Sequence, residues 1–198
     1  MAEAAEKPRR WTVDEFLEWC FQQEGRYELV DGYIVEMMAG AKKRHGIIAT
    51  NVARWLGNRL GGSSRMPFQS DMAVRTGESQ IRFPDVVVDC DLSNQDATYV
   101  AQPVVVVEVL SERTRTLDAT AKLGEYKGVD SIRHILLIEA THRAVQVHTR
   151  DDDSWSVMQF EAPTDIVHLS ALGIELSLSE IYDRVEAGSR VLRISPPG

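Results

Sequence analysis

The chain has 198 residues and a hydrophobic content of 43%, which is enough to bury a sizeable core in one domain. Its 22 basic and 30 acidic residues give a net charge of −8, which is unfavourable for a protein that binds nucleic acid with its whole surface. Two cysteines without CxxC spacing and five histidines without a zinc pattern argue against a disulfide framework and a structural zinc site.

The hydrophobic runs stop well short of the ~20 residues that cross a bilayer, and the start of the sequence has no apolar signal core. We therefore expect a cytoplasmic protein with no membrane partner. The expected organisation is a flexible N-terminal tail at 1–10, a single domain at 11–190 and a C-terminal tail at 191–198.

Two amphipathic helices are predicted in the first third of the chain. Thr12 followed by Glu15 is a capping-box pattern, which predicts a helix at 12–21. Apolar residues then recur at helical spacing over 43–60, and Gly61 follows directly. The sequence therefore predicts a long second helix with one buried face.

A hairpin is predicted between these helices. Strand-like segments at 27–30 and 33–37 flank Asp31 and Gly32. This dipeptide supplies the positive φ angles that a type I′ turn requires, so the two strands should pair directly.

The region of the long helix is also rich in basic residues. No acid occurs between Glu36 and Asp71. The basic side chains either form a wall beside a functional site or belong to an ordinary solvated helix face. They are Lys42, Lys43, Arg44, Arg54, Arg59 and Arg65.

The remaining pattern predicts an α/β fold with a mixed central β-sheet flanked by helices. The segment 104–110 is almost entirely β-branched, which indicates a central strand buried on both faces. A helix at 118–127 between this strand and 132–139 predicts a parallel βαβ step. Further strands are expected at 67–75, 81–89, 144–150 and 155–160, and a last helix at 180–186.

Two predicted strands each carry one acid. Asp85 and Glu108 stand in apolar surroundings, where an ionised carboxylate is costly unless a cation or hydrogen-bond donor compensates it. If the strands are neighbours, both acids can bind one Mg²⁺ or Mn²⁺ ion. Lys122 on the following helix would add a cation for phosphodiester chemistry, with Tyr126 one turn further on the same face. Taken singly, each of these residues also fits an ordinary structural role.

The combined motifs resemble the bacterial putative restriction endonuclease family within the PD-(D/E)XK nuclease superfamily. The resemblance extends over roughly 11–150 and implies a restriction-endonuclease-like fold. It rests on the segments 27–32, 68–75, 84–88 and 107–111, the helix with His45, and Lys122 with Tyr126.

The resemblance also implies roles for particular residues. It makes both acids metal ligands, adds the Val109 carbonyl as a further ligand and brings Glu28 to the same site from the hairpin. The sequence departs from the superfamily at Leu110, where a lysine usually stands two residues after the glutamate. The resemblance implies that in this family the lysine stands on the following helix instead, at the position of Lys122.

Three more residues are candidates for substrate binding. His45 begins the long helix and either contacts the site or simply packs at the helix end. Gln69 either points from its strand toward the acids or makes a cross-strand hydrogen bond. Tyr126 is included because it shares the face of Lys122.

The leading functional hypothesis is a Mg²⁺- or Mn²⁺-dependent endonuclease that hydrolyses DNA and acts as a homodimer. Asp85, Glu108, Lys122 and Glu28 would form its catalytic site. The alternative is a catalytically silent nuclease-like module that binds nucleic acid or protein, which the charge of −8 favours.

Overall fold

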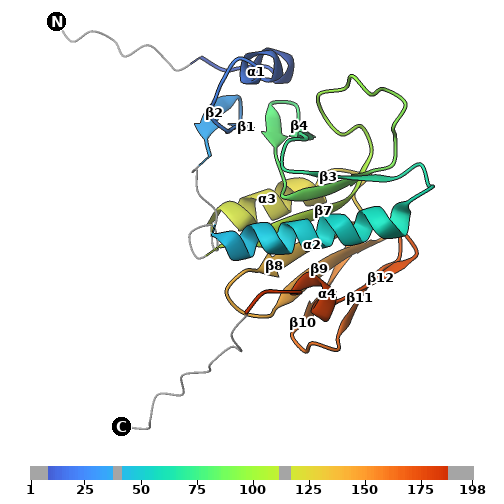
Figure 1. Ribbon diagram of the computed structural model, residues 1–198. Coiled ribbons are helices and arrows are strands. Elements are labelled where there is room, and N and C mark those ends of the chain that lie inside the picture. Colours follow the sequence, from blue (N-terminus) through green and yellow to red (C-terminus); the bar gives the residue numbers. More distant parts are fainter. Residues whose placement is uncertain (1–8, 38–41, 112–116, 187–198) are drawn as a thin grey trace, which may run out of the picture.

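The computed structural model describes residues 9–37, 42–111 and 117–186 (Figure 1). The predicted C-terminal tail at 191–198 lies outside these ranges, and so does most of the predicted N-terminal tail at 1–10. The single domain at 11–190 stays a prediction. Among the helices of these ranges, none combines the length and the apolar composition of a membrane span.

A six-stranded mixed sheet forms the larger part of the fold, in the order β10-β9-β8-β7-β6-β3. β7 and β8 are parallel, while every other neighbouring pair is antiparallel. The helix α3 connects β7 to β8, which confirms the predicted parallel βαβ step and the mixed sheet. The strands are β3 (Met66–Gln69), β6 (Val86–Asp89), β7 (Pro103–Leu110), β8 (His134–Glu139), β9 (Val145–Asp151) and β10 (Ser154–Phe160), and the helix is α3 (Leu117–Lys127).

Helices cover both faces of this sheet (Figure 1). On one face, α2 (Lys43–Leu60) has the predicted bounds, and its buried Ile48, Val52 and Leu56 pack on the valines of β6 and β7. On the other face, Tyr126 of α3 packs with buried residues of the same strands and of β8. The α2 side is completed by β11 (Ile166–Leu169), β12 (Ile174–Ser177) and α4 (Leu178–Ile181).

A second, four-stranded sheet has the order β2-β1-β5-β4 and lies beside α1. The capping box of Thr12 is present at the start of α1, as predicted. Asp31 and Gly32 have φ angles of 50° and 80°, which confirms the predicted turn between β1 and β2. The elements are α1 (Val13–Cys20), β1 (Tyr27–Val30), β2 (Tyr33–Glu36), β4 (Val74–Gly77) and β5 (Gln80–Arg82).

The predicted strands at 67–75 and 81–89 are wrong as single strands. Each is divided between the two sheets, the first into β3 and β4 and the second into β5 and β6. Ser70 leaves the extended conformation with a φ of 43°, and Pro84 has no N–H for a central ladder. The last helix, predicted at 180–186, begins earlier and is shorter, and the pair β11 and β12 was not predicted.

Candidate active site

The strands β6 and β7 bring the two predicted acids close together. Asp85 directly precedes β6, and Glu108 lies in β7. Val86 pairs with Val107, and both pack on the α2 side. Because successive side chains alternate between faces, Glu108 faces the α3 side, and Asp85, just before β6, lies close enough for its charge to raise the pKa of Glu108. The Val109 N–H donates to Asp85 Oδ2 at 2.7 Å, which ties Asp85 to the strand that carries Glu108.

Glu108 is held by α3 and surrounded by charge. The Tyr126 hydroxyl donates to Glu108 Oε1 at 2.7 Å. Burial raises the pKa of Glu108 to about 7, and the negative charges of Asp85 and Glu28 act in the same direction. Lys122 and the Tyr126 hydrogen bond oppose this rise. The carboxylate therefore sits where a bound cation would relieve an excess of negative charge.

His45 reaches this site from the start of α2. Its Nε2 lies 3.3 Å from Asp85 Oδ2, and both side chains are about four-fifths buried. The hydrogen bond with Asp85 raises the pKa of His45, and a hydrogen bond with the Val109 backbone adds to the effect. The imidazole thus contacts two of the groups that the sequence predicted as metal ligands.

Lys122 and Glu28 form a buried ion pair next to the acids. Lys122 Nζ lies 2.8 Å from Glu28 Oε1, and both side chains are more than nine-tenths buried. Glu28 belongs to the four-stranded sheet and Lys122 to α3. The structure therefore brings together the four residues that were predicted to be catalytic, Asp85, Glu108, Lys122 and Glu28.

Sequence reasoning missed two further charged residues at this position. Arg82 Nη1 lies 2.7 Å from Glu28 Oε2, and its Nε and Nη2 donate to Glu125 at 2.8 and 2.6 Å. We call Glu28, Arg82, Lys122 and Glu125 the ion cluster. A signal existed, since Arg82 stands three residues before Asp85 in an apolar segment and such an arginine needs a carboxylate partner.

Of the predicted substrate-binding residues, Gln69 is not brought to the acids, and Tyr126 reaches them but is closed to solvent. Gln69 is exposed and pairs with Val86, so its side chain shares the α2 face and not the face of Glu108. Tyr126 is completely buried and contacts Glu108. Because no part of Tyr126 reaches solvent, its position suits a residue that holds the Glu108 carboxylate and not one that contacts substrate. Leu110, at the usual lysine position, packs on the α3-side core.

The donor set fits a divalent cation. The ion cluster contains two charges of each sign, so the ionised carboxylates of Asp85 and Glu108 remain as an excess of two negative charges while His45 is neutral. Carboxylate and backbone carbonyl oxygens are the hard ligands that Mg²⁺ and Mn²⁺ prefer. Within the described ranges there is no group of three or more His, Cys, Asp or Glu side chains arranged around a metal position. Mg²⁺ characteristically keeps several waters and takes other ligands from phosphate.

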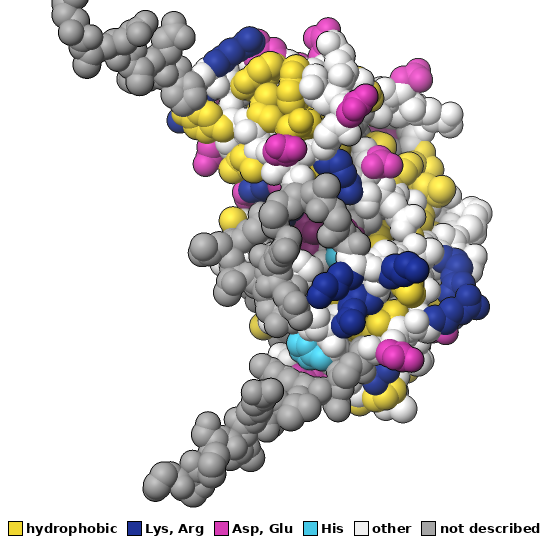
Figure 2. Space-filling model, turned by 60° about the vertical axis from the view of Figure 1, so that its left-hand side comes forward, with side chains coloured by type: hydrophobic (Ala, Val, Ile, Leu, Met, Phe, Trp, Pro, Cys, Tyr) yellow, Lys and Arg dark blue, Asp and Glu magenta, His cyan; other side chains and the backbone are white. Residues whose placement is uncertain are grey.

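Lys and Arg side chains gather on one face of the molecule (Figure 2). The helix α2, which begins beside Asp85, exposes much of the basic stretch that the sequence indicated. Arg54 additionally lies 3.6 Å from Asp183. The exposed basic residues at and within α2 are Lys42, Lys43, Arg44, Arg54 and Arg59.

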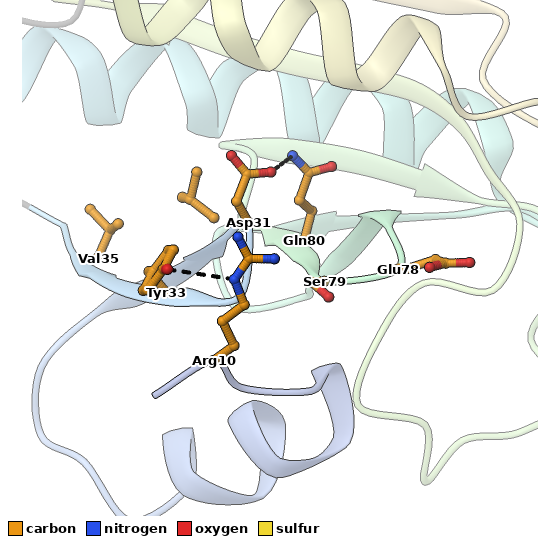
Figure 3. A pocket seen from close by; sticks show the side chains of 8 residues that line it. Arg10, Asp31, Tyr33, Val35, Glu78, Ser79 and Gln80 are labelled. Atoms are coloured by element: carbon orange, nitrogen blue, oxygen red, sulfur yellow. Dashed lines mark hydrogen bonds between the residues drawn. The ribbon is translucent and has the colours of Figure 1, made fainter. Parts of the chain in front are cut away.

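A separate hollow lies on the four-stranded sheet (Figure 3). There Arg10 Nε donates to the Tyr33 hydroxyl at 3.5 Å, and Gln80 Nε2 donates to Asp31 Oδ1 at 3.3 Å. None of the predicted site residues lines this hollow. The carboxylate site and this hollow are therefore distinct features.

The chain matches a family model, two curated proteins and a solved structure. The family model Uma2, described as "Putative restriction endonuclease", matches residues 13–179. Two uncharacterised proteins of Synechocystis sp. are 29% and 26% identical to this chain, over 85% and 82% of its length and 90% and 94% of theirs. A crystal structure described as a "putative nuclease" from Anabaena variabilis superposes with a TM-score of 0.69 at 18% identity. The match covers 86% of this chain and 96% of that one, and it confirms the predicted restriction-endonuclease-like fold.

Proposed function

Since the chain belongs to the putative restriction endonuclease family, we propose that it is a Mg²⁺- or Mn²⁺-dependent endonuclease that hydrolyses DNA phosphodiester bonds. The observation that carries the proposal is that Asp85 and Lys122 both lie close enough to Glu108 to act on its charge. Two acids with a lysine nearby in a buried site match the chemistry of phosphodiester hydrolysis better than a purely structural role.

Asp85 and Glu108 would hold the metal, with the Val109 carbonyl as a further ligand. A divalent cation bound there would supply Lewis-acid chemistry, lowering the pKa of a water and neutralising charge on the phosphate. Tyr126 orients Glu108 through its hydrogen bond, and the Val109 N–H orients Asp85. His45 contacts Asp85 from the side of α2.

Lys122 would stabilise the negative charge that develops on the phosphate. Its amine is preorganised, because Glu28 fixes it at 2.8 Å and the side chain is almost completely buried. A fixed positive charge of this kind needs little reorganisation when the phosphate is attacked. Glu28 is thus proposed as the residue that supports Lys122.

The exposed basic residues of α2 are the proposed contact for the DNA backbone. The first of these residues lie at the N-terminal end of α2, close to His45. A DNA strand that crosses α2 there reaches the acids, because His45 contacts Asp85. Phosphate binding by such residues is sensitive to salt, because it releases counterions. This local excess of positive charge would allow DNA to bind although the net charge of the chain is −8.

We propose a two-fold homodimer as the active form, because cutting both strands of DNA needs two sites and two-fold dimers are the commonest closed assembly. Light scattering at micromolar concentration is expected to give about twice the chain mass of 22.2 kDa. A mass equal to that of one chain would contradict the dimer and leave the site proposal unaffected.

The decisive experiment is a cleavage assay on single- and double-stranded DNA with Mg²⁺, Mn²⁺ or EDTA. We expect metal-dependent cutting by the wild type and none by Glu108→Ala or Asp85→Ala. Metal should raise the melting temperature of the wild type, and Asp85→Ala should lose that rise. A folded wild type that binds metal and DNA without cutting would favour the silent-module alternative, and cutting that survives Glu108→Ala would refute the site.

Lys122→Ala separates the role of the amine from that of the metal ligands. Its turnover should fall by about 10²–10³-fold, the usual cost of one preorganised electrostatic contact. The metal-induced rise in melting temperature should remain. Equal turnover of this variant and the wild type in saturating Mn²⁺ would exclude the proposed role of Lys122.

A further inference from the structure

Arg82 connects the two parts of the molecule that form the site. It is the last residue of β5 in the four-stranded sheet, and only two residues separate it from Asp85. Its side chain is 4% exposed and forms bonds to two carboxylates at once. One carboxylate belongs to Glu28 on the neighbouring strand β1, and the other to Glu125 on α3.

The two carboxylates that Arg82 binds both determine where Lys122 lies. Glu28 uses Oε2 for Arg82 and Oε1 for Lys122, so movement of this carboxylate displaces the amine. Glu125 stands three residues after Lys122 on the same helix, and Arg82 therefore also fixes the helix backbone that carries the lysine. Thr76 of β4 adds a hydrogen bond to Glu125 at 3.0 Å.

We propose that Arg82 is a positioning residue for Lys122, acting through Glu28 on one side and Glu125 on the other. A guanidinium suits this task because its planar fork can bind two carboxylates in fixed directions, which an ammonium cannot do. The effect on turnover rests on the proposed nuclease function. The effect on the position of the Lys122 amine does not.

The test compares Arg82→Lys with Arg150→Lys as a matched control. Both changes keep the positive charge of a largely buried arginine that is bonded to the α3 region. Arg150 donates to the carbonyls of Lys127 and Val129, at the C-terminal end of α3 and beyond it, whereas Lys122 lies in the middle of the helix. Comparable melting temperatures for the two variants would show that any difference between them is not general destabilisation.

Two measurements follow Lys122 directly. The first is the side-chain ¹⁵N–¹H signal of Lys122, assigned with Lys122→Met. The second is cleavage of plasmid DNA in Mn²⁺, analysed as separate kcat and KM values. In Arg82→Lys the Lys122 signal should move or broaden, and kcat should fall by about ten- to hundredfold with little change in KM. In Arg150→Lys both should match the wild type.

Glu125→Gln provides a second variant if Arg82→Lys does not fold. It weakens the bonds between Arg82 and α3 without removing a buried cation. The Lys122 signal and kcat should therefore change in the same direction as in Arg82→Lys, but by less. An unchanged Lys122 signal in folded Arg82→Lys or Glu125→Gln would overturn the inference, as would an equal change in Arg150→Lys. If the wild type does not cut DNA, the proposed function fails, and the Lys122 signal alone still decides the role of Arg82.

Discussion

The two faces of the six-stranded sheet differ in what they bury at the end of β7. The α2 face, which we call the apolar layer, consists of side chains such as Val52, Leu56, Val107 and Leu136. The opposite face, at the end of β7, instead buries the ion cluster beside Glu108. Burial of apolar surface stabilises a fold, whereas buried charges often contribute little or cost stability. The comparison indicates that the apolar layer maintains the fold, and under the proposed function the charged face serves metal and substrate binding.

The largest expected effect on stability comes from the apolar layer. Leu56 is completely buried, so Leu56→Ala should lower the free energy of unfolding by about 2–5 kcal/mol through lost burial and a cavity. Urea denaturation measures the change. Thr50→Ala, at an exposed position of the same helix, is the control and should change it by less than about 0.5 kcal/mol. Similar losses in both variants would show that α2 does not anchor the core.

Acid should weaken the apolar layer through His134. Burial lowers the pKa of His134 to about 4, and its Nε2 accepts the Ala171 N–H at 3.1 Å, which only the neutral ring can do. The unfolded chain takes up this proton near pH 6.5, so stability is full above that value and is lost as the pH falls toward 4. The loss should be on the order of 1–3 kcal/mol.

Urea denaturation at several pH values measures this dependence. His134→Gln should flatten it, while His168→Gln, which changes an exposed side chain of β11, should leave it unchanged. Burial also lowers the pKa of His148 to about 4. Part of the loss of stability in acid should therefore remain in His134→Gln. A pH dependence that is the same in His134→Gln as in the wild type would contradict the prediction.

The charged face should respond to pH in the opposite direction. Burial raises the pKa of Glu108 to about 7, so the metal-free fold is favoured while this group is protonated and loses stability as the pH rises through 7. Glu108→Gln can still accept the Tyr126 hydroxyl. In EDTA at pH 8 it should therefore be more stable than the wild type by on the order of 1 kcal/mol, although it should not cut DNA.

Thermal unfolding in EDTA tests this gain, with Asp153→Asn at an exposed acid as the control. Lower stability of Glu108→Gln at pH 8 would show that the charged face contributes to folding. The distinction between the two faces would then be incorrect.

The smallest expected effect on stability concerns α2, which packs in the apolar layer and also contacts the acid site through His45. Gly46 is exposed within the helix, and a Cβ there would meet no atom within 4 Å. Gly46→Ala should therefore stabilise the fold by about 0.5–1 kcal/mol, as alanine does in a helix interior. Thermal unfolding measures the gain. A rise in KM for DNA without a change in kcat would indicate that the substrate backbone passes closely over this residue.

The sequence predicted the local elements better than their arrangement. The capping box at Thr12, the turn at Asp31 and the bounds of α2 follow from short-range chemistry, and all were confirmed. A two-residue alternation shows that a segment is extended but not which sheet it joins. The sequence therefore predicts continuous strands near Ser70 and Pro84, where the chain passes from one sheet to the other.

The candidate site shows the same limit. Asp85 and Glu108 were recognisable because a carboxylate in an apolar strand requires a partner. Arg82 and Glu125 were missed because their pairing joins two strands and a helix that are distant in the sequence. The predicted role of Tyr126 was harder still, since helical spacing places a residue on a face without showing whether solvent reaches it.

The wide spacing of the site along the chain has a consequence during synthesis. Glu28 emerges from the ribosome early, whereas Lys122 and Tyr126 emerge only with α3. A nascent chain or proteolytic fragment that ends before α3 can contain both acids but has neither the lysine nor the tyrosine that holds Glu108. Under the proposed function, an incomplete polypeptide is therefore harmless to DNA, and cutting begins only after the two sheets and α3 have come together.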